Sequence, residues 1–327
     1  MRPRFHWSAL LLLLLILLAG AASRGHAASL RSDVLYLLPR EVGQLVFVDL
    51  REVQRSPHYA SLKAQLLPQR FEQFANFLRS IEMDLDKDIA WLAWMFVPPD
   101  AHAGERLLGI AEGNFVPERV ERFFLQQKLP IEAYRGQTLF PFGSGVGAQD
   151  LFFSFLDSST AVFGTQASLT LLLETRYGAH ENLIQNEAML AHIDQVNGRA
   201  PVWAVFDAQY TQYTLTQLVP EAARFPEFGK VAERFQHTLL QLQLSRDRQP
   251  VLQTWFKEPL DAQAFSFLLQ TGLFVQCWRL RETNPELSRA LEKTELRTVG
   301  ECLQVRLAIP EEQLKTLLAG GVVLFRY

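Results

Sequence analysis

Apolar residues in the first half of the chain follow two spacings, which predicts a mixture of strands and helices. Gln44–Asp49 and Ile89–Val97 are short runs that are apolar on both faces, a pattern typical of buried strands. Between them, residues 71–81 carry apolar side chains at helical spacing. Further along, the pattern predicts strands at 106–111 and 137–142, a hairpin over 151–163, and helices starting at Pro117 and covering 169–174.

A similar order of elements begins again at Pro201. Residues 201–207 are an apolar run ending on an aspartate, as 44–49 are, and a hairpin is predicted from Leu240 to Phe256. A helix opens after Pro259, and a strand at 303–309 and a helix at 311–318 follow. We therefore expect an α+β fold with two similar mixed sheet-plus-helix halves, a pseudo-duplication, over residues 28–200 and 201–327.

Residues 262–280 form the longest apolar helix predicted in the second half. Gln263, Gln270, Gln276 and Arg279 interrupt it, and each would be costly in lipid unless paired. The pattern therefore favours a buried core helix over a membrane span.

The chain begins with the pattern of a secretory signal peptide. Arg2 and Arg4 precede an apolar run over residues 7–22, and small residues lead to Ala27. The apolar run is short for a spanning helix. We expect a signal peptide over residues 1–27 with cleavage after Ala27, or alternatively after Ala21. The protein would then be periplasmic or secreted; retention of the segment as an anchor remains open.

Composition and charge narrow the classes of partner. The 24 Phe and 6 Trp predict a core filled by aromatic rings. Removing the signal peptide takes three arginines from the 32 basic residues and none of the 35 acidic ones, so the net charge falls from −3 to −6. This balance argues against nucleic acid or an anionic membrane as the partner, because either would attract a basic face.

The two cysteines, Cys277 and Cys302, fall on a predicted helix and at the start of a predicted strand. An oxidising compartment permits a disulfide, but the sequence does not bring the two residues within bonding distance. We expect two unpaired structural cysteines and leave the disulfide open.

Two segments partly match ligand-binding loops. Residues 84–88 place carboxylates as a calcium loop does, but Ile89 stands where that loop needs glycine and Met95 where it needs glutamate. Residues 143–147 are glycine-rich, yet a β-like run follows instead of a helix N-terminus. We interpret them as an acidic turn and an inter-strand loop.

Scattered polar residues offer no catalytic arrangement. Glu181, Glu187, His192 and Asp194 form the densest polar cluster, which we interpret as a surface helix. Asp49 and Asp207 each end a buried strand and are expected to cap the helix or turn that follows. We therefore assign no catalytic, cofactor-binding or metal-ligating residue and expect no cofactor.

Several phrases resemble those of a group of uncharacterised secreted bacterial proteins, some of them lipoproteins, defined only by a domain of unknown function. The matching segments are residues 38–39, 46–49, 56–57, 86–90, 160–164 and 305–307. Lipoprotein members carry a cysteine where this chain has Ala21, so the resemblance does not imply a lipid anchor. It implies no functional residue.

These observations lead to three hypotheses. The first is an exported binding or interaction protein without catalysis, whose partner is an envelope protein or an apolar ligand. The second is a hydrolase whose carboxylates meet only in the folded chain, because such pairs have no fixed sequence spacing. The third is a carrier of apolar ligand or lipid, suggested by the many aromatic residues.

Overall fold

The computed structural model describes residues 28–55, 59, 78–79, 83–97, 106–141, 151–218, 226–242 and 251–306. They form an α+β fold divided into two compact units. Of the described residues, the N-terminal unit contains those up to Gln54 and those from Leu78 to Pro201, and the C-terminal unit contains Arg55, Tyr59 and those from Val202 onward. The chain crosses between the units at Gln54–Arg55, later returns, and enters the C-terminal unit for the last time at Pro201–Val202.

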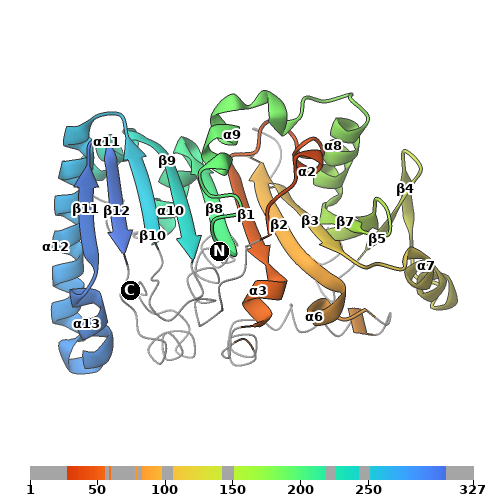
Figure 1. Ribbon diagram of the computed structural model, residues 1–327, viewed down its shortest axis with the longest axis horizontal. Coiled ribbons are helices and arrows are strands. Elements are labelled where there is room, and N and C mark those ends of the chain that lie inside the picture. Colours follow the sequence, from red (N-terminus) through yellow and green to blue (C-terminus); the bar gives the residue numbers. More distant parts are fainter. Residues whose placement is uncertain are drawn as a thin grey trace. The chain divides into compact units, whose positions relative to one another are not determined.

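The N-terminal unit is built on one antiparallel sheet (Figure 1). Its strands lie in the spatial order β1-β2-β3-β7-β6-β5-β4. Their bounds are β1 Gln44–Asp49, β2 Ile89–Val97, β3 Arg106–Gly113, β4 Glu132–Tyr134, β5 Gln137–Pro141, β6 Leu151–Phe155 and β7 Thr160–Thr165.

Short helices connect and cover these strands. They are α2 Ser32–Leu35, α3 Leu50–Gln54, α6 Leu85–Asp88, α7 Pro117–Gln126, α8 Gln166–Arg176, a 3-10 turn at Leu183–Gln185, and α9 Glu187–Asp194. Pro117 stands in the first turn of α7, where its missing N–H costs no hydrogen bond. Val120 and Phe124 fall on one face of that helix and are buried.

Aromatic rings fill the core of the N-terminal unit. The ring centroid of Phe124 lies 4.9 Å from that of Phe140, which lies 5.2 Å from that of Phe153. Phe115 and Phe155 are 5.5 Å apart. At these centroid separations the rings are in contact with one another. They therefore form a packed core. The prediction of a ring-filled core is confirmed.

The strands of the C-terminal unit pair antiparallel in the spatial order β8-β9-β10-β12-β11. The strands are β8 Val202–Asp207, β9 Phe235–Leu242, β10 Val251–Phe256, β11 Glu295–Val299 and β12 Cys302–Arg306. The helices are α10 Ala208–Leu218, α11 Pro226–Ala232, α12 Pro259–Thr283 and α13 Pro285–Glu292.

Helix α12 packs against β10, β11 and β12 and against α13 (Figure 1). Towards its N-terminus, Phe265 contacts Phe235 and Phe256, with centroids 5.1 and 5.5 Å away. Towards its C-terminus, Cys277 packs with Leu287 and Leu291 of α13. One long helix therefore contributes to two apolar clusters.

Most strands and helices predicted from periodicity are present, with ends shifted by a few residues. Among the elements that the pattern did not predict are α2, β4, α13 and β11. The prediction of a buried core helix over 262–280 is wrong for one face of α12, because Phe267, Phe274 and Trp278 on that face are exposed to solvent. The predicted signal peptide, most of the helix at 71–81, the glycine-rich loop at 143–147 and everything from residue 307 lie outside the described residues.

Candidate interaction surface

Helix α12 is apolar on two opposite faces. Ala262 and Phe265 point into the core, whereas the other side carries large apolar side chains exposed to solvent. Phe267, Phe274 and Trp278 are 69%, 73% and 69% exposed. We call the exposed set the α12 stripe: Leu260, Phe267, Leu268, Phe274, Val275 and Trp278.

The chemistry of the helix makes this stripe uniformly apolar. Residues 262–278 include no charged side chain. Thr271 lies among the stripe residues, but its hydroxyl donates to the carbonyl of Phe267 at 2.9 Å, so its only donor is used within the helix. The polar positions of this segment are filled by Gln and Ser, not by acids or bases.

The extent of the stripe is large for an isolated surface. Taking about 200 Å² for a ring and less for an aliphatic side chain, the exposed parts of the six residues amount to roughly 700 Å². Contiguous apolar patches of this size on soluble proteins usually mark contact with a protein, ligand or membrane. The α12 stripe is therefore the strongest candidate for a functional surface.

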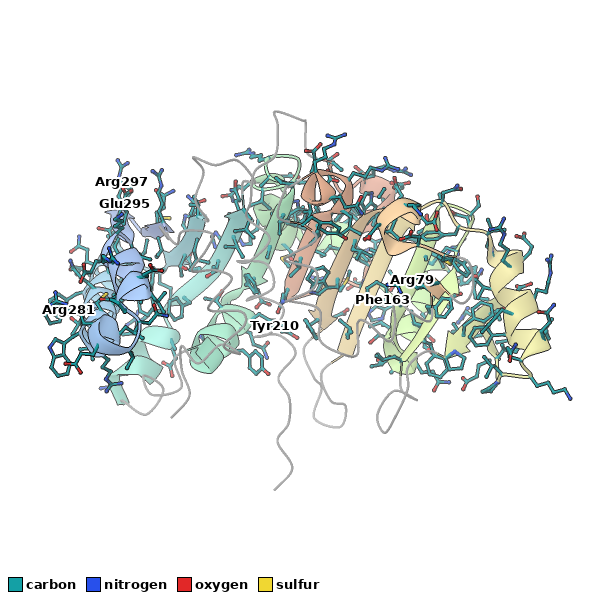
Figure 2. All side chains as sticks on the ribbon, turned by 90° about the horizontal axis from the view of Figure 1, so that it is seen from below. Arg79, Phe163, Tyr210, Arg281, Glu295 and Arg297 are labelled. Carbon is teal, nitrogen blue, oxygen red and sulfur yellow. The ribbon has the colours of Figure 1, made fainter. Side chains whose placement is uncertain are left out.

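Within α12 itself, charged residues lie only near the two ends of the helix. Glu258, before the helix, pairs with Arg234 at 3.9 Å, and Arg281, near its end, pairs with Glu292 at 3.5 Å. Arg281 is labelled in Figure 2, on the same side of the unit as Glu295 and Arg297 of the edge strand β11. Charges on an edge strand discourage further strands from adding to the sheet, so the apolar helix is the more plausible contact surface.

A polar hollow in the N-terminal unit is a weaker candidate. It is lined by Arg40, Glu41, Glu181, Gln185, Asn186 and Glu187. Three of its four charged residues have ion-pair partners: Arg40 Nη1 lies 2.5 Å from Glu181 Oε2, and Glu41 Oε2 lies 2.9 Å from Nε2 of His180. These surface ion pairs account for its polar character.

The polar cluster predicted from the sequence is only partly assembled. Glu181 and Glu187 both line the hollow, while Asp194 is exposed at the other end of α9. His192 is half-buried, and burial lowers its pKa. Met189 and Ile193 form the buried face of α9, so its interpretation as a surface helix is confirmed.

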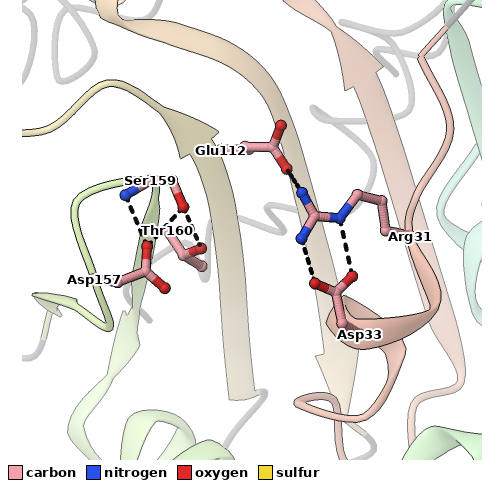
Figure 3. Close-up of polar contacts among 6 residues, drawn as sticks. All are labelled: Arg31, Asp33, Glu112, Asp157, Ser159 and Thr160. Carbon is pink, nitrogen blue, oxygen red and sulfur yellow. Dashed lines mark hydrogen bonds and ion pairs between the residues drawn. The ribbon is translucent and has the colours of Figure 1, made fainter.

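Other polar groups in the N-terminal unit stabilise local structure. Asp84 accepts from the N–H of Asp86 at 3.0 Å and begins α6, as expected of an acidic turn. Figure 3 shows Arg31 paired with Asp33 and, at 3.4 Å, with Glu112.

The turn between β6 and β7 is held by Asp157 (Figure 3). Its carboxylate accepts from the N–H and the hydroxyl of Ser159, both at 2.7 Å. Partial burial raises its pKa, but hydrogen bonds from Ser159 and Thr160 outweigh that effect, and the net pKa lies below its usual value.

The two aspartates that end buried strands are helix caps, as predicted. Asp49 accepts from the N–H of Glu52 at 3.1 Å and from that of Ala28 at 2.8 Å. Asp207 accepts from the N–H of Tyr210 at 2.8 Å. Burial raises the pKa of Asp207, against the effect of its backbone hydrogen bonds.

Both cysteines are unpaired, Cys277 buried and Cys302 half-buried, and burial raises the pKa of each thiol. Within the described ranges, no three His, Cys, Asp or Glu side chains gather closely enough to hold a metal ion. Across the same residues, no helix combines the length and the hydropathy needed to cross a bilayer, α12 included.

No protein-family model matches the chain, and no curated protein matches it. Two solved structures, crystal forms IV and I of TP0453, are similar to it, with TM-scores of 0.46 and 0.45. Their identities to this chain are 10% and 11%, and the likeness covers 87% and 89% of this chain and 96% and 97% of theirs. Similarity at this level says nothing about function.

Sequence reasoning missed the α12 stripe because it assigned every apolar residue of that helix to one core. The signal was present in the sequence, since apolar residues occur all around this helix over residues 262–278. A single sheet can cover only one side of a helix, so a helix apolar all round must meet something else on its other side.

Proposed function

We propose that this chain is an exported interaction protein without catalysis, and that the α12 stripe is the surface through which it binds. The observation that carries this proposal is the exposure of Phe267, Phe274 and Trp278 on a helix face without charge. Burying such rings is the main source of free energy at protein interfaces.

Export rests on the sequence of residues 1–27, with its basic start, short apolar run and small residues before Ala28. The partner expected in that location is a protein or apolar surface of the cell envelope. The acidic charge of the chain favours neither nucleic acid nor an anionic membrane.

We also infer a pseudo-duplication. The strand order β1-β2-β3-β7-β6 of the N-terminal unit has the same form as β8-β9-β10-β12-β11 of the C-terminal unit. In each unit an aspartate at the end of the first strand caps the next helix, and a helix opening with proline follows the third strand. This correspondence makes α7 the counterpart of α12.

The proposal is tested by photo-cross-linking in cells that naturally carry the gene. A photoreactive amino acid replaces Phe274 on α12 or, as the control, Leu125 on α7, which is 68% exposed. We expect a cross-linked product from position 274 and none from position 125. The same amino acid is then placed at positions 267 and 278. If none of positions 267, 274 and 278 gives a cross-linked product, the α12 stripe is not a binding surface.

A further inference from the structure

The exposed face of α12 carries the spacing of a helix-pairing surface. Leu260, Ala264, Phe267, Thr271, Phe274 and Trp278 follow one another at intervals of four, three, four, three and four residues. All six are exposed. Alternating steps of three and four residues bring side chains onto one line of a helix, which is how two helices pack along their length.

We propose that a second copy of this chain covers the α12 stripe, with the two α12 helices antiparallel. This inference rests on the proposed function of the stripe and names its partner. Antiparallel packing would form three kinds of layer: Phe267 with the partner's Thr271, Phe274 with the partner's Ala264, and Trp278 with the partner's Leu260. In the first two, a ring faces a small side chain.

Complementary volumes favour this orientation over the parallel one. In a parallel pair each residue meets its own copy, so Phe267 and Phe274 would face identical rings while Ala264 faced alanine and left space. The helix dipoles also oppose each other favourably when the helices run antiparallel. The symmetric arrangement is a two-fold interface, the commonest kind in homo-oligomers.

Charge and area are consistent with a second copy as the occupant. The chain is acidic overall, yet residues 262–278 carry no charge, so two identical faces meet without repulsion. Two stripes of roughly 700 Å² would bury on the order of 1,400 Å², within the about 1,200–2,000 Å² of specific interfaces. A membrane-surface helix would instead carry lysine or arginine along its polar face, where α12 has glutamine.

The test measures the mass of the purified chain by sedimentation over a concentration series. We expect the unmodified chain to reach twice the mass of one chain. Phe274→Glu and Ala264→Lys each place two charges in the interface and should each weaken self-association by about 100-fold or more. Leu125→Glu on α7 is the matched control and should leave the dimer intact. Circular dichroism checks that each variant is folded.

Mixing the two variants gives the decisive result. In an antiparallel pair, the glutamate at position 274 of one copy faces the lysine at position 264 of the other, and the second Phe274–Ala264 layer remains native. The mixture should therefore regain the dimer mass, whereas each variant alone stays monomeric. An unmodified chain that stays monomeric, single variants that still dimerise, or a mixture that does not recover would each overturn the proposal.

The outcome separates this inference from the proposed function. A monomeric chain whose position 274 cross-links to a different protein in cells would refute the dimer and leave the α12 stripe as a binding surface. A monomer that floats with phosphatidylcholine–phosphatidylglycerol vesicles would likewise refute the dimer, in favour of a lipid surface. A monomer with no cross-link at the stripe would refute both.

Discussion

Single residues show how this chain uses polar groups mainly to hold its backbone in place. Asp49 and Asp207 satisfy helix N–H groups, and Asp157 satisfies a turn. The capping roles of Asp49 and Asp207 were correctly predicted from their position at the end of a strand, because an aspartate there is the usual helix cap. Their burial was not predictable, since it depends on residues distant in sequence.

Asp207 should make the fold less stable as the pH rises. Its pKa is raised in the folded chain, so the folded state binds this proton more tightly than the unfolded state does. The resulting stability is present below the unfolded pKa of about 3.9 and is lost as the pH rises through the folded pKa.

Asp207→Asn should abolish this part of the pH dependence while still accepting from the N–H of Tyr210. Urea unfolding from about pH 4 to pH 7 measures it. Asp207→Ala, which loses both the titrating group and the cap, should be about 1 kcal/mol less stable than Asp207→Asn at every pH. An unchanged pH profile for Asp207→Asn would contradict this assignment.

Gly109 is required by close packing within the sheet. It pairs with Phe163 of β7, and a Cβ atom at Gly109 would lie 2.0 Å from that ring, which Figure 2 labels. Gly109→Ala should therefore lower the free energy of unfolding by about 1–3 kcal/mol. Adding Phe163→Leu should recover part of that loss, giving a coupling energy in a double-mutant cycle. Additive effects would show that the ring is not the obstacle.

At the scale of elements, periodicity located the buried strands better than it located the edge strand β11 or the exposed face of α12. Alternation and apolar runs identified β1, β2 and β8, because buried strands impose a strong pattern. Glu295–Val299 escaped prediction because three of its five residues are exposed, so it shows no apolar run. The surface role of α12 escaped prediction because which face of a helix is covered depends on the number of layers, not on the helix itself.

Two glycines of the C-terminal unit, Gly272 and Gly300, should respond in opposite directions to replacement by alanine. Gly272 lies inside α12 with open space around its Cα, so Gly272→Ala should stabilise the fold by about 0.5–1 kcal/mol. Gly300 joins β11 to β12 with φ +57°, a conformation alanine adopts only with strain. Gly300→Ala should therefore be destabilising by about 1 kcal/mol. Thermal unfolding of both variants checks the signs, and a destabilised Gly272→Ala would show that α12 needs this glycine.

At the scale of the whole molecule, two units of matching strand order follow a predicted export signal, and the C-terminal unit carries an exposed apolar helix. The partner could not be predicted from the sequence, because which apolar side chains stay exposed is decided only by the fold. What the sequence does predict is the processing site.

The mature chain should begin at Ala28. Mass spectrometry of the protein recovered from cells should find the mass lowered by residues 1–27, and Ala27→Phe should block cleavage because the site needs a small residue. Leu125→Phe changes the surface without touching the site and serves as control. A full-length chain free in the cytosol would contradict export.

The most direct test of the central claim is hydroxyl-radical footprinting of Trp278 and Phe274, compared between dilute purified protein and intact cells. The account predicts that both side chains oxidise readily in dilute protein, as their exposure requires, and are protected several-fold in cells, while Leu125 reacts equally in both. Equal oxidation of Trp278 and Phe274 in the two conditions would show that nothing covers the α12 stripe where the protein works, and would contradict its role in binding.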